Sequence, residues 1–254
     1  MRKIVIELSS VGKKFIMGFT GLFLCLFLVV HLGGNFLLLR HDNGAAFNAY
    51  SHFMETSWII RIIEFVLLGV FVIHIVMAFI LAKENRSARP IPYAVNKASE
   101  NSSWFSRYME ITGGIIFIFL CVHLYNFLIS QRFFHDYPSM YAAVKTIFHN
   151  PWYCAFYVIC LVWVGLHLIH GFQSSFQSFG FRHPVFFPWI QRAGLLFVIL
   201  IFSGFIFIPI YLYFAKSSTA VETSYFGQVS RIRDSHLKMV HKNVKIFSGS
   251  KGKS

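Results

Sequence analysis

Charge is scarce in this sequence. Charged residues make up 13% of its 254 residues, and Asp and Glu number only 10 against 23 Lys and Arg. Soluble domains carry about 25% charged residues, so too little polar surface is available to cover a soluble core. The 56% share of hydrophobic residues also excludes a disordered chain. The basic residues lie between long apolar runs rather than on one face, so we expect a lipid bilayer and no nucleic acid as the surroundings.

Cysteine is scarce as well. The chain has four cysteines, and all of them lie inside apolar runs, which favours small buried side chains over a disulfide framework. No Cys-x-x-Cys-His motif occurs, which excludes covalent attachment of a c-type haem. The sequence also lacks an iron–sulfur cysteine set and a dinucleotide-binding loop.

Long apolar runs dominate what is present. A spanning helix needs about 20 apolar residues, and five uncharged runs qualify: Phe15–Leu39, Phe65–Ala82, Ile111–Gln131, Thr146–Phe181 and Ala193–Ala215. We expect the second helix to begin near Trp58, because Arg61 and Glu64 lie one helical turn apart and can pair or snorkel. Pro151 is expected to open the fourth helix. The sequence therefore predicts an all-α integral membrane protein with five transmembrane helices in residues 1–216, followed by a polar basic tail in residues 217–254.

The distribution of Lys and Arg predicts the orientation of these helices. Eleven basic residues lie in the loops on the side of the N-terminus, and four lie on the opposite side. This asymmetry places the N-terminus in the cytoplasm. Five helices then place the C-terminus outside, although the tail from Lys216 onward carries eight Lys and Arg. The first apolar run is too long for a signal peptide and is expected to be retained.

Histidines within the spans are the candidates for chemistry, because ionisable residues at that depth are uncommon and usually functional. Five of the 12 histidines lie there: His31, His74, His123, His167 and His170. His31 and His123 each precede an outer arginine by nine residues, which puts both about 13 Å below the outer boundary. His74 precedes Lys83 by nine residues and lies at a similar depth from the inner side, and His167 follows the start of its helix as His74 does.

Two opposed imidazoles at one depth are what a b-type haem needs. Neutral imidazole suits iron, and ligation by two histidines leaves no open position, which is typical of electron transfer. Zinc is a competing metal, but structural zinc favours four clustered ligands. His170 lies one turn from His167 and could replace it as a ligand. The fifth helix has no histidine and is expected to flank a four-helix haem-binding core.

Arranged in this order, the residues resemble the di-haem cytochrome b membrane-anchor subunit of bacterial succinate:quinone oxidoreductases, over roughly residues 10–215. The segments that carry the resemblance are residues 20–24 leading to His31, Ala46-Phe47-Asn48 and residues 51–56 in the first outer loop, Val72-Ile73-His74, Thr112-Gly113, Val122-His123-Leu124, and His167 with Gly171.

The resemblance implies two haem b groups, with His31 and His123 as axial ligands of the outer haem and His74 and His167 as those of the inner haem. It also implies a flavoprotein subunit, an iron–sulfur subunit on the cytoplasmic face, a bacterial inner membrane, and a membrane quinone, menaquinone in most members. Electrons would pass from the iron–sulfur subunit through both haems to the quinone. This chain would not itself act on succinate.

The quinone site is expected near the outer haem, where His52, Glu55 and Asn35 are the candidate residues. Polar loop residues of this kind can equally be structural caps. Two further functions stay open on the sequence. One is the cytochrome b subunit of another quinone-linked enzyme, such as a hydrogenase, a formate dehydrogenase or a nitrate reductase. The other is a transporter without haem that uses its membrane histidines as proton relays.

Overall fold

The computed structural model describes residues 9–87 and 108–215. By its contacts the chain divides into a unit from Met1 to Tyr213, which contains the spans up to the last residue but one of the fifth, and a second unit from Phe214 to Ser254. The basic tail predicted for residues 217–254 lies outside the described residues. So does most of the loop between the second and third spans, which contains several of the cations used for the predicted orientation.

All regular structure in the described part of the chain is helical, and five segments are long and apolar enough to cross a membrane. They are α1 (Ser10–Asn35) continued by η1 (Phe36–Leu39), α3 (Trp58–Ser87), α6 (Met109–Leu124) continued by η2 (Tyr125–Phe134), α8 (Pro151–Ser178) and α9 (Phe187–Phe214). The prediction of an all-α membrane protein with five spans is confirmed. Two short helices, α2 (Ala45–Thr56) and α7 (Met140–His149), were not predicted.

The helices extend beyond the apolar runs wherever a charged residue can reach the polar boundary. The first begins before Lys13, the second continues past Lys83, and the last begins before Arg192. Long basic side chains bury their stems and keep the charge in the headgroup layer, so they do not end a helix. The start of α3 at Trp58 agrees with the prediction, and Arg61 pairs with Glu64 at 2.8 Å.

Local caps explain several helix starts. Ser9 accepts a hydrogen bond from the backbone of Gly12 at 3.1 Å, and Ser139 does the same for Ala142 at 3.2 Å. The side-chain oxygen of Asn150 accepts a hydrogen bond from the backbone N–H of Trp152 and so caps α8. Pro151 occupies the first helical position, where its missing backbone N–H costs no hydrogen bond. These caps separate α7 from α8 within the run that the sequence presented as one apolar segment.

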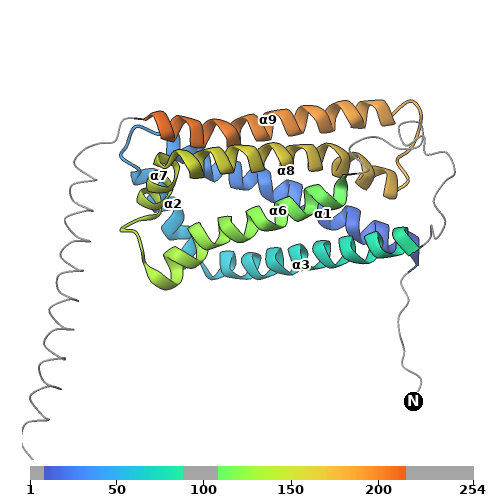
Figure 1. Ribbon diagram of the computed structural model, residues 1–254, viewed down its shortest axis with the longest axis horizontal. Helices are drawn as coiled ribbons and strands as arrows, with labels where there is room; N and C mark the ends of the chain where they lie inside the picture. Colours follow the sequence, from blue (N-terminus) through green and yellow to red (C-terminus); the bar gives the residue numbers. More distant parts are fainter. Residues whose placement is uncertain (1–8, 88–107, 216–254) are drawn as a thin grey trace, which may run out of the picture. The chain divides into compact units, whose positions relative to one another are not determined.

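The bundle is held most closely where α1 packs against α3 and α8, and where α6 packs against α8 (Figure 1). Small residues allow this approach: a Cβ atom added to Gly18 of α1 would lie 3.2 Å from the Cα atom of Ser175 in α8. Helix α9 runs along α8 and touches it at Gly165, which lies under Val198 and Phe202 of α9. Small residues at such contacts are typical of membrane helices, whose association depends on close packing.

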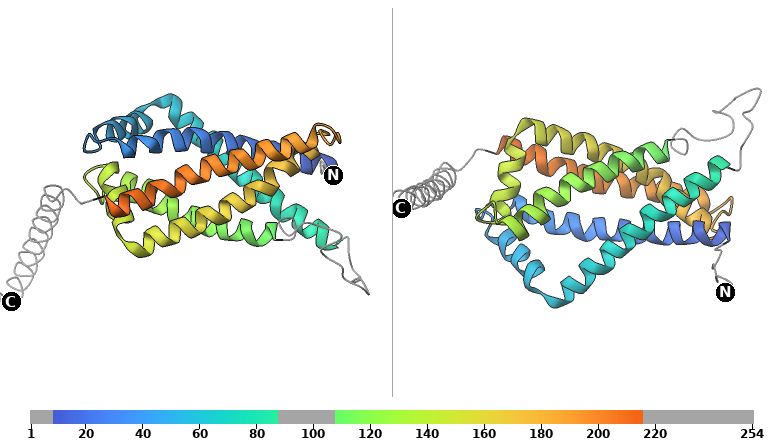
Figure 2. Two further views of the ribbon diagram at one scale, coloured as in Figure 1. Left: turned by 90° about the horizontal axis from the view of Figure 1, so that it is seen from above. Right: turned by 60° about the horizontal axis from the view of Figure 1, so that its bottom comes forward.

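Helix α3 differs from the other spans. It crosses α1 obliquely (Figure 2) and contains no buried residue. Ion pairs hold its two ends instead. Near one end Lys13 pairs with Glu84, and near the other Glu64 accepts from Arg132 at 3.3 Å as well as from Arg61. Helix α3 is therefore placed by its packing along α1 and by these ion pairs, not by a buried face of its own.

The two short helices lie together at the opposite end of the bundle from the start of α1 (Figure 1). Asn48 of α2 accepts a hydrogen bond from the backbone N–H of Tyr141 in α7 at 3.0 Å. Burial is the main cause that raises the pKa of the Tyr141 phenol, with smaller contributions from Tyr211 and Asp42. Burial also raises the pKa of Tyr50, whose ring covers Gly34. Both phenols are therefore uncharged at neutral pH.

Candidate functional site

The first pair of histidines joins α1 to α6. The rings of His31 and His123, called the outer pair below, have their centroids 5.8 Å apart and planes at 86°. They come from helices that are 92 residues apart in the chain and that are not among the closely packed pairs of the described bundle. The two helices therefore meet here through the side chains of these histidines, whose rings lie nearly perpendicular to each other.

Aromatic rings enclose the outer pair. Phe27 stacks on His31 at 5.2 Å, and Phe205 of α9 lies 5.6 Å from the same ring. On the other side, Phe119 and Phe127 lie 5.7 and 5.2 Å from His123. These neighbours are uncharged and mostly apolar, so they exclude water and favour neutral imidazole. Helix α9 contributes a wall to the site without a histidine, in the flanking position predicted for it.

The second pair, His74 and His167, is called the inner pair. The Nδ1 atom of His74 on α3 lies 3.0 Å from the Oγ1 atom of Thr20 on α1. The Nδ1 atom of His167 on α8 lies 3.0 Å from the Oγ1 atom of Thr112 on α6. The two histidines are near enough to interact electrostatically. Each inner histidine thus meets a threonine from the helix that supplies an outer histidine.

A glycine follows each of these threonines and makes room for the ring. A Cβ atom added to Gly21 would lie 3.4 Å from Cε1 of His74, and one added to Gly113 would lie 3.9 Å from Cε1 of His167. Both imidazoles therefore lie against bare backbone. Each Thr-Gly sequence thus combines a hydroxyl beside the ring with room for the ring.

The residues of the outer pair fit axial ligation of one macrocycle. Two imidazoles on opposite faces of a metal have centroids about 6 Å apart, given metal–nitrogen bonds of about 2 Å, and the observed value is 5.8 Å. Among the described residues no three His, Cys, Asp or Glu side chains gather as a metal site. Each pair therefore offers two protein ligands, the number that a haem needs, rather than the three or four of a zinc site.

Comparison with known proteins gives the family. The family model of the succinate dehydrogenase/fumarate reductase transmembrane subunit matches residues 85–208, about half of the chain. The chain belongs to this family. No curated protein and no solved structure matches it. The match includes His123 and His167, and it favours a succinate:quinone oxidoreductase subunit over a subunit of another quinone-linked enzyme and over a transporter.

Membership makes the chain a multi-pass membrane subunit of a succinate dehydrogenase or fumarate reductase. In this family such a subunit anchors the soluble subunits of the complex and works with membrane quinone. Membership alone does not assign haems, axial histidines or quinone residues, so these assignments depend on the geometry of the two pairs.

The candidate quinone residues are not gathered by the structure into one site. His52 and Glu55 are exposed on α2. Asn35 lies one turn beyond His31, where its side-chain amide donates to the carbonyl of His31 at 2.8 Å. Asn35 thus contacts the backbone of an outer histidine, whereas His52 and Glu55 lie on the short helix beyond it.

The outer-loop motif behind the family resemblance has a structural role. Phe47 is buried in the core, and Asn48 connects α2 to α7 through the backbone of Tyr141. The motif therefore builds the cover over one end of the bundle. His170 is half-buried one turn from His167, and no described hydrogen bond ties it to a neighbour.

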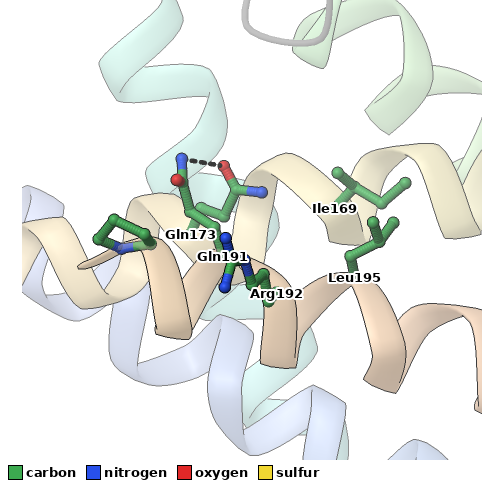
Figure 3. A pocket seen from close by; sticks show the side chains of 6 residues that line it. Ile169, Gln173, Gln191, Arg192 and Leu195 are labelled. Carbon is green, nitrogen blue, oxygen red and sulfur yellow. Dashed lines mark hydrogen bonds between the residues drawn. The ribbon is translucent and has the colours of Figure 1, made fainter. Parts of the chain in front are cut away.

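A pocket of about 470 Å³ lies between α8 and α9 (Figure 3). Gln173 and Gln191 share a hydrogen bond of 3.4 Å at its polar side, and Arg192 lies over the ring of Trp189. None of the residues predicted to bind a cofactor lines this pocket. This pocket is therefore separate from the predicted ligand residues.

The sequence interpretation gave the two threonines no role of their own, although a signal was present. Residues 27–32 read Phe-Leu-Val-Val-His-Leu and residues 119–124 read Phe-Leu-Cys-Val-His-Leu, an offset of 92 residues. Thr20-Gly21 and Thr112-Gly113 share this offset. It exceeds the 20–50 residues of the common structural repeats. Two units of the chain, α1 to α3 and α6 to α8, each contain a span, a short helix and a second span. In each unit the threonine of the first span contacts the histidine of the second span.

Proposed function

We propose that this chain is the di-haem cytochrome b membrane anchor of a succinate dehydrogenase. It carries electrons from an iron–sulfur subunit through two b-type haems to a membrane quinone, for which menaquinone is the expected species. The observation that carries this proposal is the outer pair: His31 and His123 face each other at 5.8 Å, from different helices, inside an aromatic enclosure. Family membership supports the enzyme complex to which this function belongs.

In this proposal the outer pair holds one haem and the inner pair holds the other. A haem bound by two histidines supplies a one-electron carrier with no open position. The chain's own residues set the positions of the two sites. Thr20 contacts an inner histidine and lies 11 residues before His31 on the same helix, so the two pairs are about 16 Å apart along α1. Aromatic side chains around the outer pair keep water away from it.

The expected partners follow from this arrangement. A flavoprotein subunit and an iron–sulfur subunit would dock on the cytoplasmic side, nearer the inner pair, and the bacterial cytoplasmic membrane would contain the bundle with the N-terminus inside and the C-terminus outside. The quinone would react near the outer pair. Asn35 is the best placed of the three candidate residues because it already contacts the backbone of His31, and His52 and Glu55 on α2 are candidates for exchange with the aqueous phase.

Haem content and spectra test the proposal. The chain is purified in detergent, and its reduced-minus-oxidised spectrum is recorded beside a haem assay. We expect two haems per chain with the absorption of low-spin iron held by two histidines. A chain that binds no haem would exclude the proposed function and favour a transporter that relays protons.

Single substitutions then assign the ligands. His31→Ala or His123→Ala should remove one haem, and His74→Ala or His167→Ala should remove the other, because each loses one of two axial ligands. His170→Ala is the matched control within the same turn of α8 as His167 and should retain both haems. If His170→Ala loses the inner haem while His167→Ala retains it, the ligand assignment is wrong.

A further inference from the structure

We propose that Thr20 and Thr112 are positioning residues for the inner pair. Each threonine oxygen accepts the N–H of its histidine's Nδ1 atom and thereby keeps the Nε2 atom of that ring free to bind iron. The inference rests on the proposed function for the identity of the iron ligand. The hydrogen bonds themselves are a property of this chain.

The donors and acceptors around Thr20 give the direction of the bond. A hydroxyl has one proton and two lone pairs. The Oγ1 atom of Thr20 lies 2.9 and 3.0 Å from the carbonyl oxygens of Ile16 and Met17. A carbonyl can only accept, and both carbonyls lie within reach of the one hydroxyl proton, so we assign that proton to the helix backbone, as is usual for threonine in a membrane helix. The lone pairs of Oγ1 are then left to accept from the Nδ1–H of His74.

The same geometry recurs at Thr112. Its Oγ1 atom donates to the carbonyl of Met109 at 3.0 Å and faces Nδ1 of His167 at 3.0 Å. Both threonines are buried, with 4% and 3% of their surface exposed. Water therefore does not compete for the hydroxyls, and two helix pairs reach the same arrangement from different parts of the sequence.

A neutral imidazole has one N–H and one bare nitrogen. When Nδ1 carries the proton, Nε2 is the bare nitrogen, which is the form a metal binds. Histidines that bind metals typically donate their other N–H to a fixed acceptor, which orients the ring and raises the basicity of the ligand. Thr20 and Thr112 meet this requirement, while Gly21 and Gly113 leave the space in which the rings lie.

The outer pair provides a contrast within the same molecule. The Nδ1 atom of His123 is buried and has no hydrogen-bond partner among the described residues. The outer histidines are held by aromatic contacts instead. Threonine substitutions should therefore affect the inner haem and leave the outer haem unchanged.

The expected effect is a change in reduction potential. A hydrogen bond to Nδ1 makes the ligand more basic, which stabilises the oxidised iron. Loss of one such bond should shift the reduction equilibrium of the inner haem about two- to tenfold toward the reduced form. At 59 mV per tenfold change for one electron, the midpoint potential should rise by about 20 to 60 mV.

The test uses the full chain with its haems. Thr20→Val and Thr112→Val remove the hydroxyl at nearly constant volume, and Thr20→Ser and Thr112→Ser retain it. Ser203→Ala is the control, because Ser203 donates to the carbonyl of Leu200 at 3.0 Å on an exposed face of α9. Redox titration resolves the two haems, and electron paramagnetic resonance reports the ligand field of each.

We expect each valine variant to raise the midpoint potential of the inner haem and to leave that of the outer haem unchanged. The serine variants and the Ser203→Ala control should have the same two potentials as the parent chain. If a valine variant loses the inner haem and the matching serine variant keeps it, the hydroxyl is again shown to act. Unchanged potentials in both valine variants would overturn the proposal, as would equal loss of haem in the valine and serine variants.

A separate measurement distinguishes this inference from the proposed function. Nitrogen-15 magnetic resonance of the haem-free chain reports which imidazole nitrogen is protonated. His74 and His167 should be protonated at Nδ1, and Thr20→Val and Thr112→Val should alter this at one ring each. A parent chain without haem would refute the proposed function, whereas Nε2 protonation of both rings would refute the role of the threonines.

Discussion

The hydrogen bond between Asn126 and Tyr157 offers a quantitative test of how the outer pair is supported. The side-chain amide of Asn126 donates to the Tyr157 hydroxyl at 3.1 Å and connects η2 to α8. Tyr157 is 3% exposed and Asn126 is 7% exposed. The ring of Tyr157 also lies 6.1 Å from that of His123. Tyr157→Phe, Asn126→Leu and the double variant form a complete cycle.

Burial determines the expected magnitudes. Tyr157→Phe leaves a buried amide without its partner, which costs about 1–3 kcal/mol, and Asn126→Leu leaves a buried hydroxyl in the same state. The double variant removes both polar groups, so it should be less destabilised than the sum of the single variants. Side-chain hydrogen bonds between membrane helices contribute about 0.6 kcal/mol on average and up to about 1.7 kcal/mol. For a pair this well buried we expect a coupling near 1 kcal/mol.

The assay is reversible unfolding in mixed micelles, followed by circular dichroism. Haem absorbance is recorded in parallel, and Tyr157→Phe should retain the outer haem because the phenyl ring still packs beside His123. Additive effects, with a coupling below about 0.3 kcal/mol, would refute the argument that this hydrogen bond connects the two helices. Loss of the outer haem in Tyr157→Phe alone would instead show that the hydroxyl contacts the cofactor site.

Two further predictions concern helix packing. Gly18→Val should destabilise the bundle by about 1–3 kcal/mol, because a Cβ atom there would lie 3.2 Å from the backbone of Ser175. Gly33→Val is the control, because a Cβ atom at Gly33 meets nothing within 4 Å. Equal melting temperatures for the two variants would contradict this prediction. Glu64→Gln should loosen the start of α3 and increase its hydrogen exchange, because Arg132 loses the carboxylate that it contacts at 3.3 Å. Added salt should produce part of the same loosening in the parent chain, and a salt-independent exchange rate would contradict the ionic explanation.

The fold could be predicted from the sequence because the bilayer imposes its own length scale. About 20 apolar residues must follow one another to cross it, and charges are confined to the ends of such runs. The start of α3 at Trp58 and of α8 at Pro151 could be inferred from single residues. The short helices α2 and α7 could not, because neither is long enough to give a distinctive apolar period, and their positions depend on contacts such as that of Asn48 with Tyr141.

The candidate site was only partly accessible from the sequence. Counting residues from the charged boundaries gave depths for the histidines, and the structure brings His31 beside His123. The partners of the inner histidines depend on which faces of neighbouring helices meet, which no spacing within one helix reveals. The repeated Thr-Gly sequence marks Thr20 and Thr112 but does not identify their partners, because only the packing of the helices brings their hydroxyls to 3.0 Å from the rings.

The lack of buried residues in α3 has a consequence for how the bundle can move. Helix α3 has no buried residue, and its ends are held by ion pairs that can break and re-form in the headgroup layer. The other spans share a core that would be disrupted by a similar movement. Helix α3 is therefore the span whose tilt can change with the least loss of buried contact, and the hydrogen bond of His74 to Thr20 would respond to such a change.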